Sequence, residues 1–373
     1  MGTNFSTEKV RPGAYWRYEN YGGPIEAGAA DGVCAAVIKT TEASSATVET
    51  LESVKDIGKK YGTDGNAMLY EMFRGGAKKI YACSCDAYDN AFEALKPLRW
   101  NVIGIDTDDS VAQDALVTFV NEMYDDGKFV MGVVGDSASF ASRAEPYQAF
   151  NDYKIIYVGS GFKYADKVNA DKTAVEVKRE GFLAAARVAG MIAGTPANAS
   201  ITHKVITGAV EVTEHLTNAN YEAAIQNGML TFSTAPNGTI WVESGVNTLV
   251  NLDTEDDAGW KKIKRTKIRF ELMQRMNDTV ENLVGSINND ADGRATIIQA
   301  AQGVCNSMVN EKKLLAGAKV VLDDANPPEG ESAWFLIFAD DIDSLEKMYF
   351  TFKFRFAPEA EAAPQEETAT VED

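Results

Sequence analysis

Short apolar segments alternate with helix-like segments over residues 31–160, and this alternation constrains the fold more than any other feature of the sequence. The apolar runs have the length of buried strands. The expected strands are 33–38, 79–82, 102–105 and 129–134, and the expected helices are 48–60, 67–73, 90–95 and 110–124. Because strands that alternate with helices form βαβ units, the pattern predicts a largely parallel sheet covered by helices.

The alternation continues beyond residue 150 and changes character near residue 240. Before that point we expect strands at 155–158, 205–208 and 230–232, and a long helix of small residues at 175–193. After it we expect strands at 240–242, 248–250, 319–322 and 333–338, with an antiparallel pair of helices at 259–283 and 296–315. The predicted fold class is therefore mixed, α/β and α+β, in a multidomain chain.

Size and charge exclude several classes of partner. The chain has 373 residues, which at about 150 residues per domain allows two or three domains. It carries 36 basic and 55 acidic residues, a formal net charge of −19, which argues against nucleic acid and against an anionic membrane surface. No apolar run approaches the roughly 18–20 residues of a membrane span, so we expect no membrane insertion. The four cysteines suit reduced thiols better than a disulfide framework.

The segment 349–356 alternates strictly between large apolar and polar side chains, as a half-buried strand does. One face carries Phe350, Phe352, Phe354 and Phe356, and the other carries Thr351, Lys353 and Arg355. Such a strand would aggregate if it stayed unpaired. It could pair within its own chain or be added to a sheet of a neighbouring subunit. A second aromatic segment, 14–18, lies near the other end of the chain and favours exchanged arms.

Several short motifs occur in order along almost the whole chain. They are 11–15 (RPGAY), 188–196 (VAGMIAGTP) with 200–202 (SIT), 245–250 (GVNTLV), 292–294 (DGR), Ile342, and 346–350 (EKMYF). With these motifs the sequence resembles the tail sheath protein of contractile phage tails and of R-type bacteriocins. Each motif is weak alone, and the ordered set is fairly specific.

The resemblance implies a structural subunit with no catalytic residue, no cofactor and no metal. Sheath subunits polymerise as stacked six-membered rings around an inner tail tube and contract to drive the tube through a target cell envelope. The expected partners are other copies of the chain, the inner tube protein, and baseplate and tail-terminator proteins. The expected location is a virion or phage-tail-like particle assembled in the bacterial host cytoplasm. A phage and a headless bacteriocin stay equally open.

The resemblance also implies a domain organisation. The expected parts are an N-terminal arm (1–30), a subtilisin-like α/β region (31–239), a C-terminal α+β core (240–345), a C-terminal arm strand (346–357) and a disordered acidic tail (358–373). The arms would add strands to a small sheet in neighbouring subunits. The residues assigned to these inter-subunit strands are Ala14, Tyr15, Trp16, Arg17, Tyr18, Tyr349, Phe350, Thr351, Phe352, Lys353, Phe354, Arg355 and Phe356.

One basic cluster stands out in this acidic chain. It comprises Lys261, Lys262, Lys264, Arg265, Lys267 and Arg269. The cluster is either a solvated helix face or an electrostatic contact with the inner tube or an adjacent subunit, where charge sets register more than affinity. Both interpretations stay open at this point.

Three alternatives can be weighed on the residues themselves. A subtilisin-related hydrolase would need a serine paired with His203 or His215, and the serine loops at 135–137 and 159–161 lack the G-x-S-x-G form. A calcium loop at 288–299 matches N-x-D-x-D-G but has Gln299 in place of the bidentate glutamate. Another self-assembling tail component, such as the inner tube, would usually be shorter.

Overall fold

The computed structural model describes residues 32–41, 43–142, 150–168, 174–252 and 257–354. Its centre is a seven-stranded sheet with the order β10-β6-β5-β4-β1-β3-β2. The strands are β1 (Val33–Lys39), β2 (Thr47–Leu51), β3 (Lys79–Cys85), β4 (Val102–Ile105), β5 (Met131–Gly135), β6 (Ile155–Val158) and β10 (Met229–Leu230). All neighbours are parallel except β2, which pairs antiparallel with β3. The predicted parallel sheet is confirmed.

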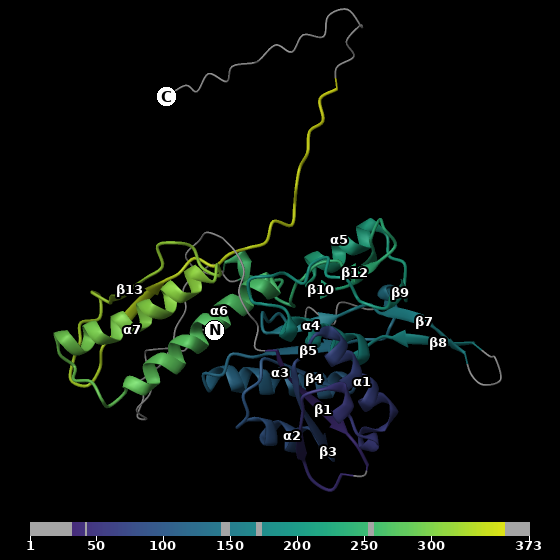
Figure 1. The fold of residues 1–373 in the computed structure, drawn as a ribbon, viewed down its shortest axis with the longest axis horizontal. Helices are drawn as coiled ribbons and strands as arrows, with labels where there is room; N and C mark the ends of the chain where they lie inside the picture. The colour runs from purple at the N-terminus through teal and green to yellow at the C-terminus, as the bar shows by residue number, and fades with distance from the viewer. Residues whose placement is uncertain (1–31, 42, 143–149, 169–173, 253–256, 355–373) are drawn as a thin grey trace, which may run out of the picture.

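Helices cover both faces of this sheet, which makes a three-layer sandwich (Figure 1). One face packs against α1 (Gly62–Gly75) and α4 (Phe182–Gly194), and the other packs against α2 (Tyr88–Leu95), α3 (Ser110–Asp125) and α5 (Asn218–Gln226). In β1 the even-numbered residues join the first cluster and the odd-numbered ones the second. Because both faces are buried, the strand is a continuous apolar run with no polar face.

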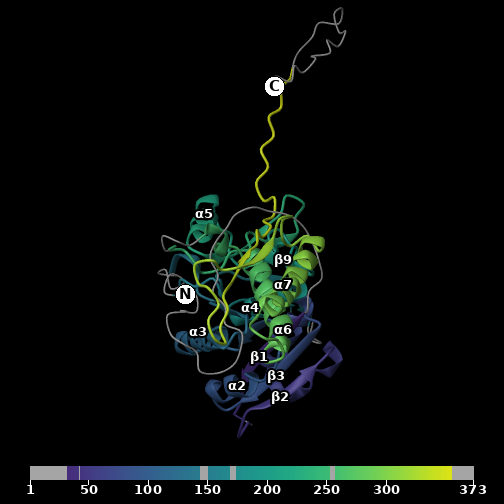
Figure 2. The ribbon, with the colours of Figure 1, turned by 90° about the vertical axis from the view of Figure 1, so that its left-hand side faces the viewer.

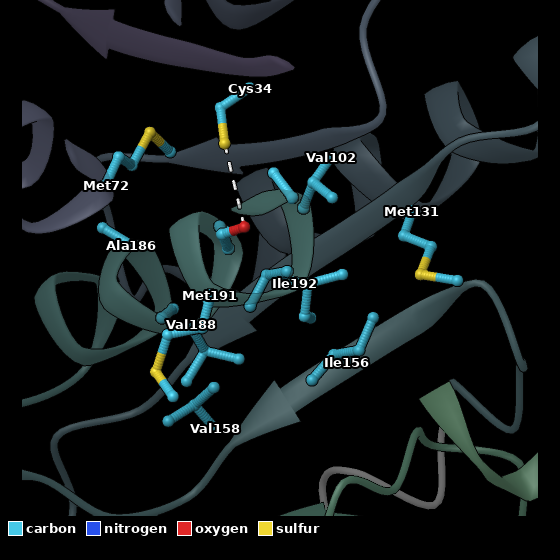
Figure 3. Packing of buried hydrophobic residues seen from close by; sticks show 14 of the residues in the cluster. Cys34, Met72, Val102, Met131, Ile156, Val158, Ala186, Val188, Met191 and Ile192 are labelled. Atoms are coloured by element: carbon cyan, nitrogen blue, oxygen red, sulfur yellow. Dashed lines mark hydrogen bonds between the residues drawn. The ribbon is translucent and has the colours of Figure 1, made fainter. Parts of the chain in front are cut away.

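Helices α1 and α4 approach so closely that their backbones touch. A Cβ atom on Gly190 would lie 2.0 Å from the carbonyl oxygen of Met72, and one on Gly75 would lie 2.4 Å from that of Arg187. Glycine is therefore required on both helices where they cross. The other side of α4 faces the strands, where Val188 and Ile192 lie near Val102 and Ile156 (Figure 3).

Two predicted helices were wrong in part. Residues 48–60 form strand β2 and two 3₁₀ turns, η1 (Val54–Asp56) and η2 (Lys59–Tyr61). Residues 174–179 form strand β8 (Ala174–Arg179), and α4 begins only after Gly181, whose φ is +54°. In both cases a short segment with β-branched residues, TVETL or AVEVKR, forms an edge strand in place of the expected helix.

Two small antiparallel sheets flank the sandwich. One contains β7 (Phe162–Val168), β8 and β9 (Ala209–Val212), and the other pairs β11 (Phe232–Thr234) with β12 (Ile240–Val242). The strands expected at 205–208 and 248–250 were wrong. Val205 makes only an isolated bridge to Trp241, and the Thr248 hydroxyl donates to the Asp152 carbonyl at 2.8 Å.

The folded part of the chain that precedes residue 347 forms the body of the molecule. Its C-terminal part is a helix pair beside a hairpin (Figures 1 and 2). It contains η5 (Ala258–Lys261), α6 (Ile263–Val280), η6 (Glu281–Leu283), α7 (Ala291–Asn310), β13 (Lys319–Leu322) and β14 (Phe335–Phe338). Met276 of α6 and Cys305 of α7 pack with Val320 and Ile337 of the hairpin. Helix α7 starts earlier than expected because the Asp290 side chain accepts a hydrogen bond from the Gly293 N–H at 2.7 Å and caps it.

The end of α7 is tied to α6 by Glu311. Its carboxylate accepts hydrogen bonds from Arg275 at 2.5 and 2.7 Å and from Lys313 at 2.7 Å. These contacts lower the pKa of Glu311 to about 2, with the Arg275 hydrogen bond as the main cause. A carboxyl group whose pKa is depressed by folding stabilises the fold above its unfolded pKa, and this contribution is lost as the pH falls through the folded value.

We therefore expect Glu311→Gln to destabilise the protein at neutral pH and to remove part of its acid sensitivity between pH ~4.5 and ~2. After discounting for partial exposure, the expected loss at pH 7 is about 1–2 kcal/mol of unfolding free energy. Urea denaturation at pH 7 and pH 3 measures it. Equal losses at the two pH values would contradict the assignment.

Candidate functional site

The segment 347–354 leaves the body and extends into solvent (Figures 1 and 2). Its large side chains are exposed: Tyr349 at 89%, Phe350 at 75%, Phe352 at 76% and Phe354 at 92%. Within the described residues, this segment pairs with no strand of its own chain. The sequence assigns it to a strand, so its backbone groups and its phenyl rings both lack the partner that such a strand requires.

The remaining arm residues lie outside the described part of the chain. These are Arg355 and Phe356, the N-terminal residues Ala14, Tyr15, Trp16, Arg17 and Tyr18, and the tail 358–373. Their assignment to inter-subunit strands and to a solvated tail stays a prediction.

The outer edge of β13 is capped by a side chain. The Gln302 side chain of α7 accepts from the Val320 N–H at 3.0 Å and donates to the Ala318 carbonyl at 2.9 Å. A side chain thus takes the place of a further strand there. Among the strands that the structure describes, β13 and β14 form a two-stranded sheet.

The basic cluster faces the chain's own carboxylates. Arg265 donates to Asp341 at 2.7 and 2.9 Å and to Asp257 at 3.0 Å. Arg269 binds the same two carboxylates and lies over the Trp260 ring. The two guanidinium groups hold the pKa of Asp341 below its usual range, although burial alone would raise it. These contacts revise the interpretation of Arg265 and Arg269 as a solvated face, because their charges are used inside the body.

The four lysines of the cluster also have internal partners. Lys261 donates to the Val250 carbonyl at 2.6 Å, and Lys267 donates to carbonyl groups at the C-terminal end of α4, where a cation is favourable. Lys262 pairs with Asp343 at 2.6 Å and with Glu346 at 3.1 Å, and Lys264 donates to the Ser344 hydroxyl at 3.2 Å. Lys262 and Lys264 therefore contact the segment from which the C-terminal arm departs. A contact of the cluster with an inner tube stays a prediction.

Burial and charge act in opposite directions on Lys262. Burial would lower the pKa of its ammonium group, but the hydrogen bond to Asp343 and the charges of Glu346 and Asp343 raise it above the ordinary value. The ammonium group is therefore a stable cation at physiological pH. The charge pattern of the sequence identified this lysine but not its acidic partners. The signal that could have indicated those partners was the group of carboxylates between residues 340 and 346.

The two serine loops meet in a small polar cavity of about 260 Å³. Ser137, Ser160, Asp136, Glu180 and Glu214 line it. The Ser160 hydroxyl accepts from the Phe232 N–H at 2.8 Å, and His203, stacked on Trp241, and His215, beside Glu211, are not among the lining residues. Among the residues that the structure describes, the cavity thus offers neither serine the imidazole base of a Ser-His-Asp triad.

The described residues offer neither a metal-binding group nor a helix that could span a membrane. No group of three or more histidine, cysteine or acidic side chains is arranged to hold a metal ion. No helix has both the length and the apolar character needed to cross a bilayer.

The fold of the chain is similar to that of solved structures whose sequences have low identity to it. The sheath tail protein of Desulfitobacterium hafniense matches with a TM-score of 0.68 and 16% identity, over 92% of this chain and 100% of that one. The sheath tail protein of Listeria innocua gives 0.63 and 15%, over 86% and 97%. The anti-feeding prophage helical sheath in its contracted state gives 0.65 and 12%, over 93% and 99%. The fold is therefore that of the tail sheath proteins.

Part of the sequence also matches a family model. Residues 83–248 match the model described as the phage tail sheath protein central domain. The match agrees with the resemblance seen in the short motifs, which is thereby confirmed. No curated protein matches the sequence significantly.

Proposed function

We propose that the protein is the structural subunit of a contractile tail sheath, which polymerises as stacked rings around an inner tube and contracts to drive that tube through a cell envelope. The observation that carries the proposal is the unpaired aromatic arm 347–354, in a chain whose fold is that of sheath proteins. A monomer gains nothing from four exposed aromatic side chains. A polymer buries them at every contact between subunits.

The arm and the apolar face of the β13–β14 hairpin have complementary chemistry. The arm supplies an extended backbone with alternating phenyl rings. On β14, Phe335 and Ile337 pack toward the helix pair. A strand added to such a sheet in a neighbouring copy, with its phenyl rings on that face, would extend the same apolar layer.

The domain limits and partners belong to this proposal. The arms are 1–30 and 346–357, the body comprises 31–239 and 240–345, and 358–373 is a solvated tail. Within the body, the β11–β12 hairpin passes across residue 239, so the two parts are joined by strand pairing. The partners are further copies in six-membered rings, an inner tube, and baseplate and terminator proteins of a phage tail or phage-tail-like particle assembled in a bacterial cytoplasm. The subtilisin-like character of 31–239 is part of the same proposal.

Electron microscopy of the purified protein in negative stain tests the proposal. A sheath subunit gives tubes or rings with a regular axial repeat, alone or on preformed tail tubes. Discrete monomers at every concentration, with or without tubes, would overturn it. A protease assay with casein distinguishes the hydrolase alternative, which requires turnover.

Proline substitutions in the arm test strand addition. Neighbouring N–H groups of a strand point to opposite edges, so Phe352→Pro and Lys353→Pro remove a donor from opposite edges. At least one should raise the polymerisation threshold about tenfold or more, because a lost ladder bond and a distorted register recur at every subunit contact. Sedimentation against concentration measures the threshold.

The matched controls are Phe352→Ala and Lys353→Ala, which keep both N–H groups. All four variants should melt like the wild type, since both side chains are exposed. If both proline variants polymerise like their alanine controls, the arm does not act through a backbone ladder.

A further inference from the structure

The chain between β14 and the arm is held against the body by a series of contacts. Asp341 is bound by Arg265 and Arg269, and Ile342 is 1% exposed. Asp343 then pairs with Lys262, and the Ser344 hydroxyl accepts from Lys264. The segment is therefore fixed residue by residue along the N-terminal end of α6.

The last of these contacts is made by Glu346, and it uses both carboxylate oxygens. Oε1 accepts from the hydroxyl groups of Ser200 at 3.1 Å and Thr202 at 2.9 Å, and Oε2 lies 3.1 Å from the Lys262 ammonium. The partners come from two separate parts of the chain, the loop after α4 and the residue before α6. A carboxylate held at both oxygens by such partners has a defined direction as well as a position.

The hydroxyl groups that bind Glu346 are held in place by hydrogen bonds of their own. The Thr202 hydroxyl also accepts from the Gly245 N–H at 2.9 Å, and the Ser200 hydroxyl accepts from the Thr202 N–H at 3.0 Å. The Glu346 side chain is only 20% exposed. The carboxylate thus enters a partly desolvated pocket of fixed donors, where an ion pair is screened less than on the surface.

Contacts with the body stop directly after this residue. In the described segment 347–354 the rings of Phe352 and Phe354 stack on each other, with their centroids 6.1 Å apart. The boundary between fixed and free chain therefore falls between Glu346 and Lys347. Only residues 347 and 348 separate the last fixed residue from Tyr349, where the predicted strand begins.

We infer that Glu346, held by Ser200, Thr202 and Lys262, is a positioning residue that fixes the root of the C-terminal arm and makes residues 347–348 the pivot between subunits. The inference rests on the proposed function, because it assigns a role in delivering the arm to an acceptor. If the contact is lost, the last anchor becomes Ser344, held by Lys264, and the free tether to residue 349 grows from three residues to five. Effective concentration falls with about the 3/2 power of tether length, so this lengthening lowers it about twofold.

A label at Met348 reports the pivot directly. All four native cysteines are buried, and burial raises the pKa of the Cys34 and Cys85 thiols to about 12 and of Cys83 and Cys305 to about 11. A thiol-reactive spin label on Met348→Cys will therefore react at that site alone. Met348 is 61% exposed, so the label does not disturb the packing.

In this background we expect Glu346→Ala to make the label more mobile in the monomer and, without the label, to raise the polymerisation threshold about twofold. Glu346→Gln keeps acceptance from the hydroxyl groups and loses the ion pair, so it should be intermediate. Glu222→Ala removes an exposed carboxylate of α5 and should change neither readout. All three should melt like the parent protein.

The two readouts separate this inference from the proposed function. Unchanged label mobility in Glu346→Ala overturns the inference, whether or not the protein polymerises. A wild type that never polymerises overturns the sheath proposal, while the label still reports whether Glu346 fixes the arm root. Increased label mobility in Glu346→Ala with an unchanged polymerisation threshold overturns the role of Glu346 in delivering the arm to its acceptor.

Discussion

Removal of residues 349–373 is expected to give a protein that folds normally and forms no polymer. The large side chains in the described part of this segment are exposed and it pairs with no strand of the described chain, so its loss should leave the melting temperature within about 1 °C of the wild type. Strand donation at every subunit contact is lost at once. The polymerisation threshold should therefore rise at least about a hundredfold, the scale on which linked contacts act.

The control for this deletion is a chain that ends at residue 357. It lacks only the acidic tail and keeps the whole alternating strand, so it should polymerise like the full chain. Sedimentation and negative-stain microscopy of the two truncations give the comparison. If the chain that ends at residue 348 unfolds, the strand belongs to its own body. If it polymerises normally, the arm is dispensable.

The second large effect is expected from Glu71→Ala in the core of the body. Glu71 is fully buried and accepts hydrogen bonds from Tyr164 at 2.6 Å, Arg179 at 3.0 Å and Arg187 at 3.4 Å. Arg187 is itself 2% exposed, so the substitution leaves an uncompensated charge in the interior. Removing one partner of a buried pair costs about 3–5 kcal/mol of unfolding free energy. Urea denaturation at pH 7 measures the loss.

Two further variants make this result specific. Glu93→Ala removes a glutamate whose side chain is 71% exposed and whose pair with Lys96 lies on the surface, and it should cost less than about 0.5 kcal/mol. The double variant Glu71→Leu, Arg187→Met removes both charges and should recover part of the stability. A loss for Glu71→Ala as small as that for Glu93→Ala would contradict the buried network.

Periodicity was sufficient for the buried elements of the fold. Strands such as β1, β4 and β6 are apolar on both faces, and their apolar runs have the length of strands and alternate with helical patterns. Periodicity failed for β2 and β8, which are edge strands with polar residues on their exposed faces. Segments of five or six residues next to a helical pattern are too short to separate the two periods, and only pairing with β3 or β7 decides between them.

Only part of the candidate site could be predicted, because only part of it is a local sequence pattern. The alternation of phenyl rings at 350–356 is a local pattern, so the sequence alone is enough to identify the arm. The anchor of that arm is not local. Glu346 meets Ser200, Thr202 and Lys262 across separations of more than 80 residues, and no spacing in the sequence encodes such a meeting. The charge of the basic cluster was therefore visible in the sequence, but the pairing of its members with particular carboxylates was not.

The glycine crossing of α1 and α4 has a consequence for how such a molecule deforms. Side chains between helices can change rotamer and let one helix slide past another, but backbones in direct contact have no such layer to shear. The helical layer formed by α1 and α4 consequently resists sliding within itself. In the proposed polymer, we therefore expect angular change to be concentrated at the joints between neighbouring subunits and not within this layer.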